Sequence, residues 1–287
     1  MTAWDIAGQP RKPSVLCIGA QKAGTSWLAQ VLNDHPQIWN PPYKEVQFFN
    51  YRFIPGHRYW IDWHFRNKPG EIRAGYVRRK QIIPPAMDAY LTATSTSKQR
   101  GTNHWYKKIF APAPAQAKPM DISPEYSTLP EEGVEFVSKF LPNVKVIYLI
   151  RDPVDRAVSQ LRMNLRREKR NPETLDDWLA EVENPVLEER GDYATYVPRW
   201  RRFFGPDQLL ILPYGQIRSD PFALMERVEQ HLGIGRARYD ALWRRVFATP
   251  PGLEPPPQAR AALAARLAPQ YDFLRTEFGA AFADATR

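Results

Sequence analysis

A polar turn interrupts the apolar run in "VLCIGAQKAGTSWLAQVL" (15–32), and helical spacing of apolar residues resumes after it. A strand, a glycine-containing turn and a helix N-terminus together direct several backbone N–H groups and the positive end of a helix dipole at one point. This arrangement binds anions, above all phosphate. The turn contains four residues suited to that role: Lys22, Gly24, Thr25 and Ser26.

The order of residues in this loop differs from that of nucleotide triphosphatases. In the G-x-x-x-x-G-K-[ST] loop, the lysine directly precedes a Ser or Thr that holds magnesium. Here Lys22 stands before the second glycine, Gly24. We therefore expect phosphate binding without the magnesium and triphosphate arrangement, and a P-loop nucleotide kinase is the second interpretation.

A second phosphate-binding site is predicted in "VIYLIRDPVDRAVSQL" (146–161). Arg151 ends a strand, where open α/β sheets bind ligands, and Ser159 follows about two helical turns later. An arginine and a hydroxyl hold a phosphate through charge-assisted hydrogen bonds. Two alternatives stay open, namely a magnesium-binding Asp152 and a plain ion pair among Arg151, Asp152 and Asp155.

A candidate acid–base pair comes from "KEVQFF" (44–49), which follows the helix of the phosphate loop. Glu45 is close enough in sequence to return to the same sheet edge, with Lys22 as its neighbour. A carboxylate beside a cation suits a general base and a group that stabilises developing charge. The alternative interpretation treats Lys44 and Glu45 as surface charges.

Apolar strand candidates alternate with helix candidates, which predicts a parallel sheet covered on both faces. The expected strands are 15–19, 144–150 and 208–214, and the helices that follow them are 26–34, 154–167 and 222–232, the last ending at Gly233. The expected fold class is α/β, with a P-loop-like parallel β-sheet flanked by helices. We expect a single domain (1–287).

Two stretches depart from this alternation. Residues 71–120 show little helical or strand continuity, so we expect an irregular excursion, with 71–119 an insertion or acceptor lid on a core of 13–70 and 120–287. "TPPGLEPPP" (249–257) predicts a stiff connector to a C-terminal helical segment, 259–278.

Composition limits the class of protein. At 287 residues, 43% hydrophobic and 13% aromatic, the chain is typical of a globular protein. Its one cysteine, Cys17, excludes an intrachain disulfide and a thiolate metal cluster. With no signal-peptide core and no run of about 18 apolar residues, we expect a cytoplasmic protein without a membrane span.

The formal charge of +9 predicts an anionic ligand: a nucleotide, an acidic glycan or nucleic acid. A basic nucleic-acid-binding protein is the third interpretation, because the arginine-rich stretch 156–170 would suit phosphates. No aromatic and basic stacking motif accompanies that stretch, so we expect no nucleic-acid partner. The oligomeric state is open.

The motifs together resemble the sulfotransferases that use 3′-phosphoadenosine 5′-phosphosulfate (PAPS), and more closely their carbohydrate branch, which includes the heparan sulfate N- and O-sulfotransferases. The resemblance is carried by "GAQKAGTSWL", "HPQI", "KEVQFF", "DISPEYS" and "IRDPVDRAVSQ". It implies that the first loop binds the 5′-phosphosulfate through Lys22, Ala23, Gly24, Thr25 and Ser26. It further implies that Arg151 and Ser159 bind the 3′-phosphate and that Trp27 touches the adenine.

The resemblance also assigns the chemistry. Glu45 falls where the carbohydrate branch has its catalytic base, and Lys22 would stabilise charge on the bridging oxygen as 3′-phosphoadenosine 5′-phosphate (PAP) leaves, without a metal. The acceptor would be a hydroxyl or amine of a glycan, a glycolipid or a small metabolite, with an anionic group as an option. Ile122 departs from the branch, which usually has lysine there.

Histidine is the alternative base, because the small-phenol sulfotransferases use one. His57, His64 and His104 rank below Glu45 as candidates. His35 precedes Pro36, and we expect it to be a structural residue at the end of a helix.

Overall fold

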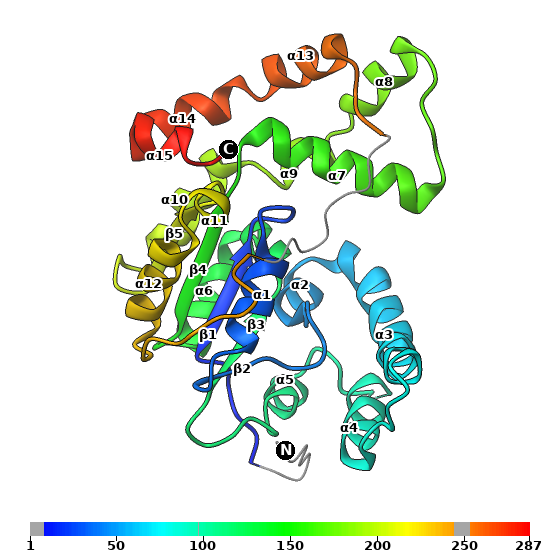
Figure 1. Cartoon of the computed structure of the whole chain (residues 1–287), viewed down its shortest axis with the longest axis vertical. Helices are drawn as coiled ribbons and strands as arrows, with labels where there is room; N and C mark the ends of the chain where they lie inside the picture. The colour runs from blue at the N-terminus through cyan, green and yellow to red at the C-terminus, as the bar shows by residue number, and fades with distance from the viewer. Residues whose placement is uncertain (1–8, 97, 244–252) are drawn as a thin grey trace.

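The computed structural model describes residues 9–96, 98–243 and 253–287. Within these ranges a single sheet has five strands in the order β2-β3-β1-β4-β5, and every neighbouring pair is parallel (Figure 1). The strands are β1 (Val15–Gly19), β2 (Ile38–Trp39), β3 (Lys118–Ile122), β4 (Lys145–Ile150) and β5 (Leu209–Pro213). Val15 lies opposite Met120 on β3 and Lys145 on β4.

The sheet is buried on both faces, which explains its continuous apolar strands. All five residues of β1, and all of β4 after Lys145, are buried. In Figure 1, α1 (Thr25–Asn33) and α12 (Pro221–Leu232) lie in front of the sheet and α6 (Glu131–Phe140) lies behind it. The predicted α/β fold with a parallel sheet between helices is confirmed.

Capping signals in the sequence fix the helices nearest the sheet edge. α7 (Pro153–Glu168) begins after Asp152, whose side chain accepts a hydrogen bond from the Asp155 N–H, and it has proline at its first position. α12 ends at Gly233 in the left-handed conformation, with φ 59°. The predicted helices 26–34, 154–167 and 222–232 match α1, α7 and α12 to within one residue at each end.

The expectation of an irregular excursion over 71–120 is wrong. The stretch contains the end of α3 (Arg58–Arg78), then α4 (Pro85–Ser95) and α5 (Asn103–Ile109), and it leads into β3. Its predicted start at residue 71 falls inside α3. Short helices with few apolar repeats formed here because tertiary packing, rather than periodicity, stabilises them.

Helices α4 and α5 belong to the main core. Tyr90 on α4, together with Trp105 and Tyr106 on α5, packs in the same apolar cluster as β1 and β4. Tyr90 donates a hydrogen bond to the Ile109 carbonyl (2.9 Å), which ties the two helices together. An acceptor-gating role for 71–119 stays a prediction.

The remaining helices surround the sheet and the loops at its edge. They are α2 (Phe48–Phe53), η1 (Pro55–His57), η2 (Pro124–Thr128), α8 (Leu175–Val182), α9 (Val186–Glu189), α10 (Tyr193–Phe203), α11 (Gln216–Ser219), α13 (Pro257–Arg266), α14 (Ala268–Phe278) and α15 (Ala280–Asp284). The predicted C-terminal helical segment is thus confirmed as two helices. The first part of the predicted connector, 249–252, lies outside the described residues. Within the described ranges, no helix has the length and apolar character needed to cross a bilayer.

Candidate active site

The carboxyl ends of the parallel strands meet at one edge of the sheet, below α7 in Figure 1. The phosphate loop follows β1, and Arg151 follows β4. Glu45 comes after β2, and its N–H donates to the carbonyl of Ile122 at the end of β3 (3.0 Å). The edge therefore has an anion-binding half at β1 and β4 and a Glu45 half at β2 and β3.

The phosphate loop adopts a conformation that leaves backbone donors free. Lys22 and Gly24 are both left-handed, with φ 71° and 86°, and Gly24 is the N-cap of α1. Because Gly24 has no side chain to cap the helix, the N–H groups of the first turn are available to an anion. The φ of 86° would strain any residue other than glycine, and a Cβ at Gly24 would also lie 3.1 Å from the Tyr214 ring, so this position favours glycine.

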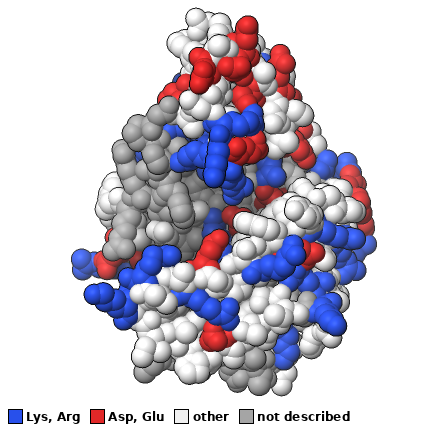
Figure 2. Space-filling view, turned by 90° about the vertical axis from the view of Figure 1, so that its right-hand side faces the viewer, with Lys and Arg blue, Asp and Glu red and all other residues white. Residues whose placement is uncertain are grey.

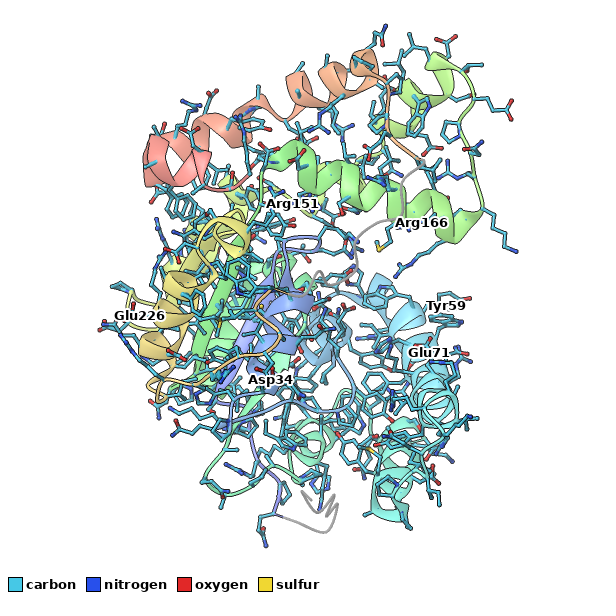
Figure 3. The ribbon with its side chains drawn as sticks, viewed as in Figure 1. Asp34, Tyr59, Glu71, Arg151, Arg166 and Glu226 are labelled. Carbon is cyan, nitrogen blue, oxygen red and sulfur yellow. The ribbon has the colours of Figure 1, made fainter. Side chains whose placement is uncertain are left out.

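The amino group of Lys22 lies among other cations. Its Nζ is 3.9 Å from the Met163 sulfur on α7. Burial lowers the pKa of Lys22 to about 8, and the positive charges of Arg151, Arg166, Arg167 and Lys44 add to the shift. Figure 3 shows Arg151 at the start of α7 and Arg166 near its far end. A bound anion would relieve this repulsion.

Arg151 has unused capacity to bind an anion. One Nη donates to the Lys22 carbonyl (3.0 Å), which supports the left-handed turn, and the guanidinium lies 4.6 Å from the centre of the Tyr214 ring. Its Nε is buried and has no hydrogen-bond partner among the described residues. A buried donor without a partner is costly unless a ligand satisfies it.

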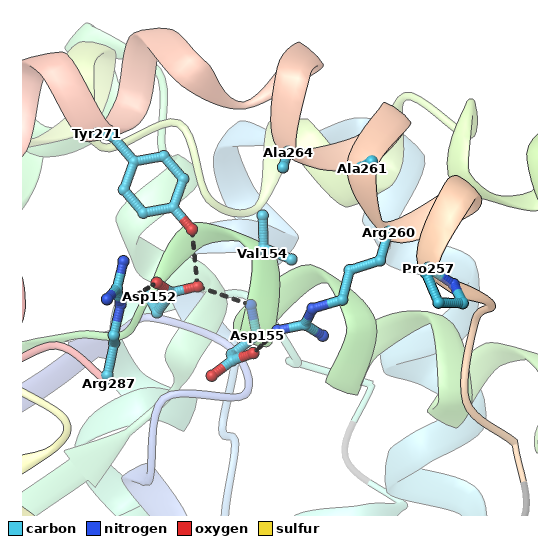
Figure 4. Close-up of a pocket in the computed structure, with 9 residues that line it drawn as sticks. All are labelled: Asp152, Val154, Asp155, Pro257, Arg260, Ala261, Ala264, Tyr271 and Arg287. Atoms are coloured by element: carbon cyan, nitrogen blue, oxygen red, sulfur yellow. Dashed lines mark hydrogen bonds and ion pairs between the residues drawn. The ribbon is translucent and has the colours of Figure 1, made fainter.

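The two alternatives for Asp152 are not supported. Its carboxylate accepts hydrogen bonds from the Asp155 N–H (3.0 Å) and the Tyr271 hydroxyl (2.9 Å), and it pairs with Arg287 (3.3 Å; Figure 4). Asp155 pairs with Arg260 instead of Arg151. The ion-pair interpretation of Arg151 is therefore wrong, and Asp152 caps α7 and holds the C-terminal residues rather than presenting open oxygens to a metal.

The other predicted nucleotide contacts differ in exposure. Ser159 is half-buried on α7, eight residues and thus about 12 Å of helix beyond Arg151. Trp27 is 5% exposed, and its indole N–H donates to the Leu242 carbonyl (3.0 Å). Tyr214, which the motifs did not single out, lies beside Gly24 and under Arg151.

Glu45 is held in an unusual backbone conformation on the other half of the edge. It has φ 68°, and Gln47 has φ 56°; non-glycine residues seldom adopt such values without support. The Gln47 N–H donates to the Ser123 hydroxyl (3.0 Å), and the Glu45 N–H is bonded to β3. The Glu45 side chain remains 38% exposed, so a substrate can reach its carboxylate.

The cation beside Glu45 is Lys44. Its Nζ lies 3.6 Å from a Glu45 oxygen and donates to the Ser26 hydroxyl (2.5 Å), so it joins the phosphate loop to Glu45. Within the described residues no ion pair connects Glu45 to Lys22. Lys44 is the neighbour of Glu45 that the motif interpretation missed, and its place in "KEVQFF" was the available signal.

A buried polar network supports the Glu45 loop. The Asp121 carboxylate accepts from the hydroxyls of Tyr106, Ser123 and Tyr126, each at 2.8 Å. Burial raises the pKa of Asp121 to about 6, although these hydrogen bonds oppose the shift. The Tyr126 hydroxyl in turn accepts from the Phe48 N–H (2.9 Å). "DISPEYS" thus fixes the segment that contains Glu45, and Tyr106 is structural rather than free for an acceptor.

The four histidines considered in the sequence analysis occupy different environments. His35 is buried, its Nδ1 accepts from the Gln37 N–H (3.0 Å) and its Nε2 lies 2.8 Å from the Gly235 carbonyl, so its structural role is confirmed. His104 is exposed on α5. Burial lowers the pKa of His64, and the charge of Glu45 opposes this, which places His64 near Glu45. His57 has its pKa lowered to about 4 by burial.

Figure 2 shows the face of the molecule that lies on the right-hand side of Figure 1, where α3 and the far end of α7 are found. This face is hollowed, and basic and acidic side chains gather around the hollow. The carboxyl ends of the strands therefore present two cations, Lys22 and Arg151, and the exposed carboxylate of Glu45. Two such cations can hold a nucleotide with phosphates at both ends, and the carboxylate can accept a proton from a second substrate.

Comparison with known proteins gives sequence relatives over most of the chain. The model of a family described as the sulfotransferase family matches residues 13–237. Bifunctional heparan sulfate N-deacetylase/N-sulfotransferase 3 of Homo sapiens is 28% identical over 244 residues, which cover 78% of this chain and 22% of that protein. Enzyme 2 of the same name in Homo sapiens is 25% identical over 242 residues, with the same coverage. The chain therefore spans about a fifth of the length of these relatives.

Solved structures share the fold. A sulfotransferase from Alicyclobacillus acidocaldarius superposes with a TM-score of 0.66 at 22% identity, covering 96% of this chain and 99% of that one. The sulfotransferase domain of the olefin synthase from Synechococcus PCC 7002 has a TM-score of 0.56 at 16% identity, covering 91% and 96%. At these identities the likeness establishes the fold.

Proposed function

Because the chain belongs to the sulfotransferase family, we propose that it transfers a sulfuryl group from PAPS to a hydroxyl or amine of an acceptor. One observation carries the proposal most directly. Two cationic side chains, Lys22 after β1 and Arg151 after β4, follow adjacent strands at one edge of the sheet. Neither forms an ion pair with a carboxylate among the described residues. PAPS has anionic groups at both ends that suit two such cations.

The residues of the site fit this donor. The left-handed turn at Lys22 and the uncapped start of α1 support a 5′-phosphosulfate site made of Lys22, Ala23, Gly24, Thr25 and Ser26. The unsatisfied Nε of Arg151 supports a 3′-phosphate site completed by Ser159. Trp27, and with it Tyr214, would contact the adenosine. When bound, PAPS supplies a sulfuryl group on a phosphate leaving group.

Glu45 would act as the general base. Its exposed carboxylate takes the proton from the acceptor hydroxyl or amine as that atom attacks sulfur in line. Lys22 stabilises the charge that develops on the bridging oxygen. Lys44, between Glu45 and Ser26, pairs with the Glu45 carboxylate and adds positive charge to the same region. These steps need no metal ion.

The acceptor is proposed as a glycan, a glycolipid or a small metabolite. The names of the sequence relatives refer to heparan sulfate, which favours a glycan. We propose that the described part of 71–119 gates acceptor entry, as its place in the sequence between Glu45 and "DISPEYS" suggests. A reducing, cytoplasmic location is proposed from Cys17, which is unpaired and buried in β1. A P-loop kinase is disfavoured, because Lys22 precedes rather than follows Gly24.

We expect PAP to bind in the presence of EDTA, with an affinity that falls as the pH rises through about 8. Lys22 has its pKa lowered to about 8 in the free protein, and a bound anion raises that pKa. The charged form therefore favours binding below pH 8, and affinity decreases by up to about tenfold per pH unit above it. Isothermal titration calorimetry from pH 7 to pH 9.5 measures this decrease.

The Lys22→Met variant provides the matched test, because it should bind more weakly at pH 7 and lose the slope above pH 8. Lys139→Met, which removes an exposed lysine on α6, should keep the wild-type profile. Absence of PAP binding, or binding of ATP only with magnesium, would contradict the proposed donor. An unchanged slope in Lys22→Met would contradict the role of Lys22.

A further inference from the structure

Four side chains meet beside the phosphate loop, at the carboxyl ends of β1 and β3, and we refer to them as the Glu125 cluster: Gln21, His57, Glu125 and Arg190. One oxygen of Glu125, Oε1, accepts a hydrogen bond from Gln21 Nε2 (2.9 Å) and pairs with Arg190 Nη1. The other, Oε2, lies 4.0 Å from His57 Nδ1. Gln21 directly precedes Lys22, so the cluster adjoins the proposed site of transfer.

The close packing of two backbone segments builds this junction. A Cβ at Gly19, the last residue of β1, would lie 2.8 Å from the Pro124 carbonyl at the start of η2. With glycine there, η2 rests directly on the end of β1. Glu125, which is 6% exposed, is thereby fixed against Gln21.

Several polar atoms of the cluster have no partner. Gln21 Oε1, His57 Nδ1 and Glu125 Oε2 are buried and make no hydrogen bond among the described residues, and neither does the adjacent Asn50 Oδ1. The Gln21 amide donates to Glu125 Oε1, and the Asn50 amide donates to the Glu125 carbonyl (3.0 Å), so the unpaired atoms of both are acceptors. A buried polar group without a partner is costly unless a ligand satisfies it.

The cluster has little unpaired positive charge that could bind an anion in addition to the Glu125 carboxylate. Arg190 is paired with Glu125, and the negative charge of Glu45 also acts on it. Burial lowers the pKa of His57 to about 4, with the charge of Arg190 adding to the shift, so His57 is neutral at pH 7. His57 and Arg190 lie at the outer side of the cluster, with side chains 20% and 19% exposed.

We propose that the Glu125 cluster is an acceptor subsite that takes an uncharged group with several hydroxyls, such as a neutral sugar ring, and that Glu125 determines this specificity. Because Gln21 Oε1 and Glu125 Oε2 are buried, a ligand would enter past the partly exposed side chains of His57 and Arg190. Its hydroxyls would then satisfy these unpaired acceptors, whereas a ligand carboxylate would face the Glu125 carboxylate. The proposal rests on the sulfotransferase function and narrows its acceptor from glycans and metabolites in general to neutral polyols at this subsite.

The test uses three acceptors with related rings: p-nitrophenyl β-D-glucoside, p-nitrophenyl β-D-glucuronide and p-nitrobenzyl alcohol. Binding to PAP-saturated protein is measured by calorimetry, and sulfation by transfer from radiolabelled PAPS. The glucoside should bind best and have the highest kcat/KM. Glu125→Gln should lower kcat/KM for the glucoside by roughly 10- to 100-fold, mainly through KM, because the glucoside hydroxyls lose their hydrogen bonds to the charged Glu125 carboxylate. PAP affinity should not change.

Glu131→Gln is the matched control, because it also removes a carboxylate paired with an arginine, but at the exposed start of α6. It should behave as the wild type. The proposal is overturned if the glucuronide is preferred, if no glucoside binds to the PAP-saturated protein, or if Glu125→Gln keeps the wild-type KM. Normal PAP binding with any of these results would leave the donor assignment intact, whereas loss of PAP binding in the wild type would remove both.

Discussion

Glu45→Gln is expected to lower the rate of sulfuryl transfer by roughly 10²–10⁴-fold while PAP affinity stays within about twofold of the wild type. Glutamine has nearly the same shape and keeps the backbone bond from residue 45 to Ile122, but it cannot accept the acceptor proton. Lys44 and Ser26 stay in place, so the phosphate loop should be undisturbed. Single-turnover transfer from radiolabelled PAPS measures the rate, and calorimetry measures PAP binding.

Glu135→Gln is the control for Glu45, because Glu135 is another accessible carboxylate beside a lysine, Lys139 (2.6 Å), but lies on α6, behind the sheet. It should leave turnover unchanged. Near-normal turnover of Glu45→Gln would contradict the assignment of the base. His64 would then become the best candidate, since it lies within the electrostatic influence of Glu45, whereas His104 is exposed on α5 and His57 belongs to the Glu125 cluster.

Arg151→Ala is expected to weaken PAP binding by roughly 10- to 100-fold, the loss typical of charge-assisted hydrogen bonds. The effect should be much smaller for adenosine 5′-phosphosulfate, which lacks the 3′-phosphate. Some loss for both ligands is expected, because Arg151 also donates to the Lys22 carbonyl in the phosphate loop. Calorimetric titration of both nucleotides measures the difference.

Arg260→Ala tests whether any arginine near α7 has this effect. Arg260 pairs with Asp155 between α7 and α13, in the pocket of Figure 4, and among the described residues it has no hydrogen bond or ion pair with the phosphate loop. Its replacement should leave the affinities for both nucleotides unchanged. Equal losses of PAP and adenosine 5′-phosphosulfate in Arg151→Ala would contradict a 3′-phosphate site.

The phosphate loop and the strands beside it were predictable because their signals are local. "VLCIG" is continuous and apolar, the turn contains Gly24, and the helix follows at once, so β1 and α1 match their predicted bounds closely. Arg151 at the end of β4 follows from the same strand-to-helix pattern. The sulfotransferase family and the α/β fold suggested by these motifs are confirmed.

Elements that depend on distant packing were missed. α4 and α5 lie in a stretch rich in Ala, Thr and Pro, with little apolar periodicity, and they are stabilised where Tyr90 and Trp105 enter the main core. β3 begins with Lys118 and Pro119, which read as a loop, but its parallel pairing with β1 places it inside the sheet. Such contacts between distant residues cannot be inferred from composition alone.

The site was predicted only where one motif contains all of its parts. The link from Lys44 to Ser26 spans 18 residues, and the pair of Glu125 with Arg190 spans 65, so neither contact can be read from spacing. The predicted neighbour of Glu45 was Lys22, whereas the structure places Lys44 there. The individual roles in donor and acceptor binding stay predictions.

The most direct test of the central claim is the fate of the sulfur atom. Purified protein is incubated in EDTA with PAPS radiolabelled in its sulfuryl group and a panel of hydroxyl and amine acceptors, and products are separated and counted. We predict that label moves to an acceptor, that PAP forms in equal amount, and that Glu45→Gln abolishes most of both. Label that stays in PAPS for every acceptor, together with magnesium-dependent turnover of ATP, would contradict the account.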